Sequence, residues 1–381
     1  MSTPLELVSL STDKEAFITE LKTYKRPVLV ISTNTLEARK DTYLWLLEGL
    51  AHKRLHTVAI DLPIEEKSLL KALDTIQPLD ADVFVALGGG AVLDGAKLLS
   101  FLSVYSDPER VKDILKGRSL PQNHDLNPPI YAVPTSLKVE SCVNTLAYVH
   151  DAYERLSYEL KHPHLLPHSG VIDLHLIETL PKERGVFQAF DTLATLIDGL
   201  MFREDAPFLE LAPNLITRLM EAMSRYLEDP KEHDTLRLFM EVGLALGRHQ
   251  YHDLKTPLMV IQDTFMSLNP NLPIGVAMRA LLIPYLKSLQ TTHEAPRLER
   301  LNRVFHRDVI GLEGEARFLE LMSKLKSFVG EFTLTKHTLY TFDISEENIS
   351  DVTQHLLITH PEFTLFDEER MYALLEQMFT S

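Results

Sequence analysis

The sequence predicts an α/β half built on a parallel sheet, followed by an all-helical half. In the first half, short apolar runs alternate with apolar residues at helical spacing, an order typical of a parallel sheet with helices on both sides. Beyond about residue 177, strand-like runs nearly disappear and helical periodicity continues to the end. The chain has 381 residues, more than one average core holds, so we expect two domains, 1–178 and 179–381.

Four apolar runs in the first half have the length of buried strands, and segments of helical periodicity separate them. The expected strands are 27–33, 56–61, 83–87 and 129–133. The expected helices are 12–24, 36–52, 65–76 and 91–104. Parallel sheets bind ligands at the carboxyl ends of their strands. These ends read Ser32-Thr33-Asn34, Asp61-Leu62-Pro63, Gly88-Gly89-Gly90 and Thr135-Ser136.

The second half shows helical periodicity throughout. The helices expected there are 182–202, 208–228, 233–252, 275–290, 296–306, 314–328 and 367–379. The change from alternating strands and helices to helices alone predicts a domain boundary near Thr179-Leu180-Pro181.

Composition narrows the classes of function. The net charge of −16 argues against a nucleic-acid partner, because phosphate binding needs a basic surface. No apolar run reaches the roughly 18–20 residues of a membrane span, and no secretory signal is visible, so no membrane association is expected. Cys142 is the only cysteine, which excludes an internal disulfide and fits a cytoplasmic location.

Three consecutive glycines, Gly88, Gly89 and Gly90, stand between an expected strand and an expected helix. Such a turn offers bare backbone N–H groups to a phosphate, and a side chain there would hold the ligand away. Asp94 and Lys97 follow in the first turns of the helix, near whatever the loop binds. A tight turn without a ligand remains the alternative.

Several segments together resemble the iron-containing alcohol dehydrogenase family, within the superfamily of glycerol dehydrogenase and dehydroquinate synthase. The first, Gly88-Gly-Gly-Ala-Val-Leu-Asp-Gly-Ala-Lys97, is similar to the family's Gly-Gly-Gly-Ser-x-x-Asp-x-Ala-Lys signature. The others are 133–136, 166–181, 190–198 and 359–370, so the resemblance spans nearly the whole chain. It implies a dehydroquinate synthase-like fold, with a dinucleotide-binding domain over 1–178 and a helical domain over 179–381 that carries the metal site.

The resemblance implies a nicotinamide cofactor, NAD or NADP. Gly89 and Gly90 would offer backbone N–H groups to its pyrophosphate, with Asp94 near the nicotinamide. Thr135 and Ser136 would lie near the adenine, although turn chemistry alone also explains these two residues.

The chain departs from the family where the adenine ribose is expected to bind. Many members carry an acid just after the first strand, and this chain has the neutral Ser32-Thr33-Asn34. The missing charge leaves NADP open and favours it, because no negative group would repel a 2′-phosphate. The alternative is an NAD site in which Thr33 or Asn34 supplies neutral hydrogen-bonding groups.

The metal end of the implied site is degenerate. The family binds a divalent ion with one Asp and three His, and Asp191 matches the first ligand. Thr195 and Ile274 stand where two histidines are expected. The third is expected near Lys255 to Gln262, and no His occurs anywhere between 253 and 292. Asp198 replaces a Glu near these ligands. A divalent Fe or Zn site is therefore doubtful, and Asp191 and Thr195 remain the candidate catalytic residues, with Asp191 the metal ligand only if a metal is bound.

Other groups could replace the missing ligands or contact a substrate. His249 and His252 lie one helical turn apart, followed by Asp253, and could form a relocated metal site with Asp191; a solvated helix end is the alternative. Lys255 could act as a cationic electrophile. Three loop histidines could contact a substrate or simply lie on a surface loop: His162, His164 and His168.

Three hypotheses follow. The first is an NAD(P)-dependent oxidoreductase that interconverts an alcohol and a carbonyl compound, with an altered or absent metal site. The second is a non-catalytic dinucleotide or small-molecule binding protein on the same fold. The third, a lyase or cyclase of dehydroquinate synthase type, lacks the matching histidines. The helical half and the resemblance suggest a homodimer acting on a small molecule.

Overall fold

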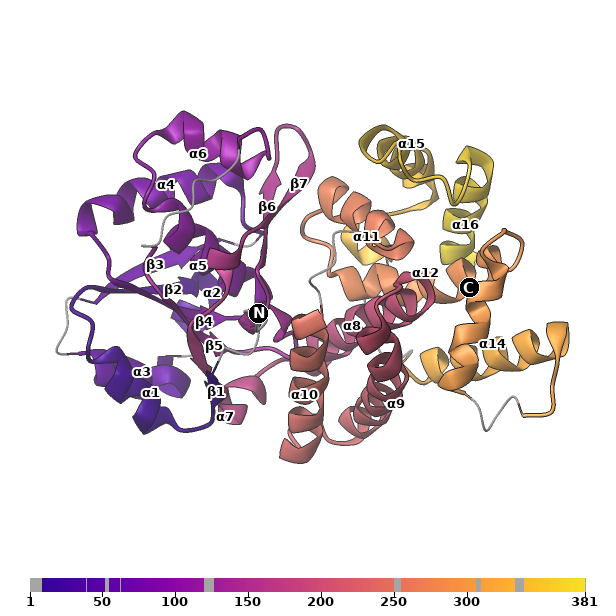
Figure 1. The fold of residues 1–381 in the computed structure, drawn as a ribbon, viewed down its shortest axis with the longest axis horizontal. Helices are drawn as coiled ribbons and strands as arrows, with labels where there is room; N and C mark the ends of the chain where they lie inside the picture. The colour runs from indigo at the N-terminus through magenta and orange to yellow at the C-terminus, as the bar shows by residue number, and fades with distance from the viewer. Residues whose placement is uncertain are drawn as a thin grey trace. The chain divides into compact units, whose positions relative to one another are not determined.

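The structure is a computed structural model that describes residues 9–38, 40–51, 55–61, 63–119, 127–249, 255–305, 310–332 and 339–380. The chain divides into two compact units (Figure 1). One contains Met1–Leu180 with Gly243–Tyr251, and the other contains Pro181–Val242 with His252–Ser381. A domain boundary between residues 178 and 179 stays a prediction.

The first unit is built on a six-stranded sheet in the order β1-β8-β5-β4-β2-β3, and all of its strand pairs are parallel. The strands are β1 (Ser9–Ser11), β2 (Pro27–Ser32), β3 (His56–Ile60), β4 (Val83–Gly88), β5 (Ile130–Pro134) and β8 (Ser169–Val171). Every residue of β2, β4 and β5 is buried, as expected of central strands with both faces covered. The predicted parallel sheet and α/β fold class are confirmed.

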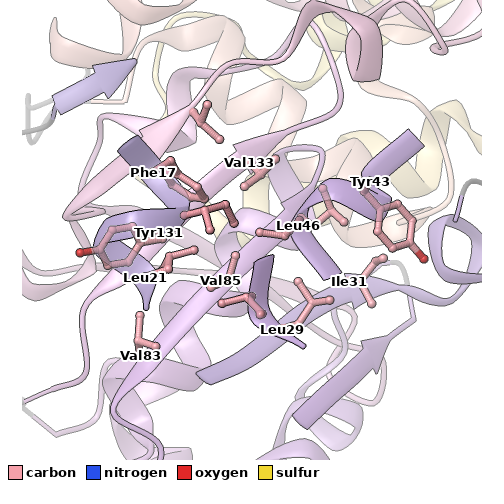
Figure 2. Packing of buried hydrophobic residues seen from close by; sticks show 14 of the residues in the cluster. Phe17, Leu21, Leu29, Ile31, Tyr43, Leu46, Val83, Val85, Tyr131 and Val133 are labelled. Carbon is pink, nitrogen blue, oxygen red and sulfur yellow. The ribbon is translucent and has the colours of Figure 1, made fainter. Parts of the chain in front are cut away.

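Helices cover the sheet. They are α1 (Lys14–Leu21), α2 (Thr33–Ala38), α3 (Leu44–Leu50), α4 (Glu66–Ile76), α5 (Gly90–Leu102), α6 (Pro108–Leu115) and α7 (Leu174–Ile177). In Figure 2, Phe17 and Leu21 of α1 and Leu46 of α3 pack with alternate residues of β2, β4 and β5, including Leu29 and Val85. The first-unit core therefore fixes the strands whose carboxyl ends carry the candidate site.

The first unit differs from the sequence-based prediction in several features, including strands β1 and β8 and helix α6, which were not predicted. The helix expected over 36–52 is divided into α2, a short 3₁₀ turn at Lys40–Tyr43 and α3. The Tyr43 hydroxyl donates to the Leu36 carbonyl oxygen at 3.3 Å, which joins the 3₁₀ turn to α2. An antiparallel hairpin of β6 (Leu146–Asp151) and β7 (Leu156–Lys161) was not predicted.

All the regular elements of the second unit, among its described residues, are helices. Its elements are α8 (Lys182–Phe202), α9 (Ala206–Glu228), α10 (His233–His249), α11 (Pro257–Leu268), α12 (Ile274–Leu289), α14 (Gly314–Glu331), α15 (Ile349–Thr359), α16 (Glu368–Thr380) and the 3₁₀ segments η6 (Ala295–Arg303), η7 (Leu339–Phe342) and η8 (Glu346–Asn348). From Gly243 onward, α10 groups with the first unit. No helix among the described residues is long and apolar enough to cross a membrane.

The helix predicted over 296–306 is a 3₁₀ segment. Its buried residues, Leu298 and Leu301, are three apart, which matches the three-residue turn of a 3₁₀ helix. The prediction was wrong in type because one such pair also fits α-helical spacing.

Candidate functional site

The glycine loop joins β4 to α5. Gly89 is the N-cap residue of α5 with an extended backbone (φ −77°, ψ −177°), and the helix begins at Gly90. No side chain caps this end, and its first turn contains no acidic residue. The first helical hydrogen bond runs from the Leu93 N–H to the Gly89 carbonyl at 3.1 Å. The N–H groups before Leu93 therefore form an uncapped, partly positive helix end that suits an anion.

The glycines bring the loops after β4 and β5 together. A Cβ on Gly88 would lie 2.5 Å from Val92, and one on Gly89 would lie 3.2 Å from the Ser136 Oγ. The Thr135 N–H donates to the Gly88 carbonyl at 3.0 Å. Above Gly90 the nearest atom to an added Cβ is the Ser141 Oγ, 3.8 Å away, so that side of the loop stays open.

Asp94 and Lys97 lie on α5 and are both buried. The Lys97 Nζ donates to the Asn144 Oδ1 at 2.7 Å and to the Leu146 carbonyl at 2.9 Å, and it lies 3.8 Å from the Asp94 carboxylate. Burial lowers the pKa of Lys97 to about 8 and raises the pKa of Asp94. Lys97 thus ties α5 to the start of β6, while a direct contact of either residue with a ligand stays a prediction.

Thr33 and Asn34 begin α2 directly after β2. The Asn34 side chain is exposed. The Thr33 Oγ1 donates to the Asp61 Oδ1 at 2.9 Å, which joins the residues that follow the adjacent strands β2 and β3. The sequence analysis predicted that Asp61 follows a strand but did not include it among the site residues. Its hydrogen bond with Thr33 depends on β2 and β3 being neighbours, which the sequence does not show.

The candidate metal end lies on α8. Asp191 is buried, and the Thr195 Oγ1 donates to the Asp191 carbonyl oxygen at 2.9 Å within the same helix. Ile274 is the first residue of α12, and a Cβ on the next residue, Gly275, would lie 1.7 Å from the carbonyl oxygen of Phe187. Since Phe187 is one turn before Asp191, the structure brings the start of α12 against this part of α8.

The residues present here do not fit a divalent ion of the family type. Among the described residues, Asp191 belongs to no group of three or more His, Cys, Asp or Glu ligand atoms that could share an ion. A threonine hydroxyl and an isoleucine are poor substitutes for two histidines. Lys255 forms an ion pair with Asp263 of α11. The structure includes His249 at the end of α10, but His252 and Asp253 lie outside the described residues.

The three loop histidines have structural partners. The His162 ring lies 4.7 Å from the Phe101 ring and 4.8 Å from the His164 ring, and the His162 Nδ1 accepts the His164 N–H at 3.2 Å. Burial lowers the pKa of His162. The His168 Nε2 lies 3.4 Å from the Glu20 carboxylate. A substrate contact for these histidines stays a prediction.

Asp198 is fully buried and organises the neighbouring helix. Its Oδ2 accepts the Leu258 N–H at 2.8 Å, and its Oδ1 accepts the Tyr285 hydroxyl at 2.7 Å. No side chain of α11 itself caps that helix, so the Asp198 carboxylate caps it from α8. Burial raises the pKa of Asp198 to about 6.

This carboxylate makes stability depend on pH. The pKa of Asp198 is about 6 in the folded protein and about 3.9 in an unfolded chain, so the folded protein binds more protons in that range. The contribution of Asp198 to the free energy of unfolding therefore falls as the pH rises, by about 2 kcal/mol from about pH 4 to about pH 7.5. In Asp198→Asn this contribution should be absent. Urea unfolding at a series of pH values measures the difference.

The exposed Glu376 on α16 supplies the matched control, Glu376→Gln, because it lies outside the first turn of its helix. Its pH profile should run parallel to that of the wild type. Parallel profiles for the wild type and Asp198→Asn would contradict the assignment of this titration to Asp198.

Comparison with known proteins finds a family model and relatives that match part of the chain. Residues 12–174 match the family model of the iron-containing alcohol dehydrogenases. The chain is 24% identical to an NADPH-dependent butanol dehydrogenase of Clostridium saccharobutylicum, over 48% of this chain and 47% of that protein. It is also 24% identical to a lactaldehyde reductase of Escherichia coli strain K12, over 64% and 63%. The aligned region thus spans about half of the first relative and just under two thirds of the second.

Solved structures share the fold. An NADH-dependent butanol dehydrogenase A from Thermotoga maritima superposes with a TM-score of 0.80 at 17% identity, covering 98% of this chain and 97% of that one. A sulfoacetaldehyde reductase from Bifidobacterium kashiwanohense in complex with NAD⁺ gives 0.77 at 14% identity, covering 98% of each chain. These similarities extend over both units, beyond the region matched by the family model.

Proposed function

We propose that the chain is a member of the iron-containing alcohol dehydrogenase family and an NAD(P)-dependent oxidoreductase that interconverts an alcohol and a carbonyl compound by hydride transfer. One observation carries the proposal: the uncapped start of α5 behind Gly88, Gly89 and Gly90, where backbone N–H groups suit a pyrophosphate. The proposal includes a small-molecule substrate, a homodimer and a cytoplasmic location.

The chain's own residues would bind and orient the cofactor, whose nicotinamide supplies or accepts the hydride. The N–H groups at the start of α5 would hold the pyrophosphate, with Thr135 and Ser136 on one side and Thr33 and Asn34 on the other. This arrangement is supported by strand order, because β4 lies between β5 and β2. Asp94, one turn into α5, would lie on the nicotinamide side.

We propose that the reaction does not use the family's metal centre. Asp191 offers one carboxylate, and Thr195 donates its hydroxyl hydrogen to its own helix. The substrate oxygen would then be polarised by other hydrogen-bond donors of the protein. Asp191 and Thr195 stay the candidate catalytic residues, as oxygen-bearing groups that would accept hydrogen bonds from the substrate.

Titration with NADH and with NADPH, followed by nicotinamide fluorescence, tests the cofactor. Turnover of a panel of alcohols and aldehydes, with and without added Zn²⁺ and Fe²⁺, tests the reaction. We expect binding and metal-independent turnover. Absence of binding at millimolar concentration would reject the proposal, and binding without turnover would favour the non-catalytic alternative, which the degenerate metal end motivates.

The substitution Ala91→Asp separates cofactor binding from stability. Ala91 is an exposed residue in the first turn of α5. A carboxylate there should stabilise the helix by about 0.5 kcal/mol through its dipole. The same charge should repel a pyrophosphate and weaken dinucleotide binding about tenfold or more. Fluorescence titration and thermal unfolding measure the two effects.

Ala91→Ser is the matched control, because it adds a polar side chain without charge. Its cofactor affinity should stay within about threefold of the wild type, well short of the loss expected from repulsion between like charges. Equal cofactor affinity for Ala91→Asp and the wild type would contradict pyrophosphate binding at this helix end.

A further inference from the structure

The residues directly after β2 are neutral, and the carboxylate of Asp61, which follows β3, lies beside them. Strands β2 and β3 are adjacent and parallel, with Ser32 opposite Ile60. The residues that follow the two strands, Thr33 and Asp61, are therefore neighbours. The Thr33 Oγ1 donates to the Asp61 Oδ1 at 2.9 Å. Thr33, the neutral residue after β2, thus hydrogen-bonds to the carboxylate of Asp61, which follows the neighbouring strand β3.

This charge lies within reach of the adenosine part of a dinucleotide held at α5. The sheet order runs β4-β2-β3, so the end of β3 is two strand spacings, about 10 Å, from the glycine loop. Asp61 is exposed, and its side chain extends from the same edge of the sheet as that loop. A ribose next to a pyrophosphate at the start of α5 would therefore lie between the two.

The chemistry of the pair distinguishes the two nicotinamide cofactors. An ionised carboxylate only accepts hydrogen bonds, and each oxygen can accept more than one, so the bond from Thr33 leaves acceptor capacity for ribose hydroxyls. A 2′-phosphate at the same place would meet a like charge, which is unfavourable. In the pair, the Thr33 hydroxyl hydrogen points to Asp61 and not to a ligand oxygen.

We propose that Asp61, positioned by Thr33, makes the cofactor site selective for NAD(H) over NADP(H). This inference rests on the proposed function, because it assigns the discrimination at the same dinucleotide site. It replaces the expectation that the neutral residues after β2 favour NADP.

The test compares the dissociation constants of NADH and NADPH for the wild type, Asp61→Asn and a control. The control is Asp74→Asn, which removes one exposed negative charge from α4 in the same unit. We expect the wild type to bind NADH about tenfold more tightly than NADPH, since repulsion between like charges opposes the 2′-phosphate. Asp61→Asn should reduce this ratio about fivefold or more, mainly by improving NADPH binding, and Asp74→Asn should leave it unchanged.

Repeating the titrations at high salt gives an independent readout, because screening weakens charge repulsion between exposed groups. The wild-type preference should shrink with salt, and the ratio in Asp61→Asn should change less. Equal or tighter binding of NADPH by the wild type, or an unchanged ratio in Asp61→Asn, overturns the inference while the proposed function stands. Failure to bind either cofactor rejects both.

Discussion

The substitution Gly275→Ala should destabilise the second unit by about 3 kcal/mol, because the added methyl group cannot fit. Its Cβ would lie 1.7 Å from the carbonyl oxygen of Phe187 and 2.4 Å from the carbonyl carbon. Both atoms belong to the backbone of α8, so no side chain can rotate to make room, and α8 and α12 would have to separate. Urea unfolding followed by far-ultraviolet circular dichroism measures the loss.

Gly330→Ala is the matched control on α14. No heavy atom lies within 4 Å of an added Cβ at Gly330. Alanine also has the higher helix propensity, so this variant should be neutral or more stable by up to about 1 kcal/mol. A loss below about 1 kcal/mol for Gly275→Ala, the size of an ordinary substitution, would contradict the close crossing of α8 and α12.

The burial of each helix explains which parts of the second unit could be predicted from the sequence. The helix expected over 182–202 is confirmed as α8, whose apolar residues recur at helical spacing. Helix α11 was missed, because it is buried on several sides, including at Leu258, Val260 and Phe265. A helix buried all around has no polar face, so its sequence lacks the amphipathic stripe that indicates a helix.

The same distinction applies to the candidate site. The glycine loop was predictable from sequence because strand, loop and helix follow one another directly at Gly88, Gly89 and Gly90. The hydrogen bond from Thr33 to Asp61 joins residues 28 apart, and the one from Leu258 to Asp198 joins residues 60 apart. Such pairs depend on strand order and helix packing, which local sequence patterns do not specify.

The paired substitution Thr195→His and Ile274→His should create a zinc site. Residues 191 and 195 are one turn apart on α8, so a histidine at 195 would lie on the same face as the Asp191 carboxylate. Gly275 holds the start of α12 against Phe187, one turn before Asp191, which brings position 274 to the same region. Thr195 and Ile274 are both only partly buried, so histidines can be accommodated. Two imidazoles and one carboxylate form a typical three-ligand zinc set.

Thermal unfolding with and without Zn²⁺ measures this gain. Zinc at one hundred times its dissociation constant would stabilise the double variant by about 2.7 kcal/mol, and the wild type should not respond. Adding Asp191→Asn to the double variant should abolish the response, because the amide removes the anionic ligand. A double variant that ignores zinc would contradict the convergence of α8 and α12 at this point. A wild type stabilised equally by zinc would show that the ion binds residues other than those at positions 191, 195 and 274.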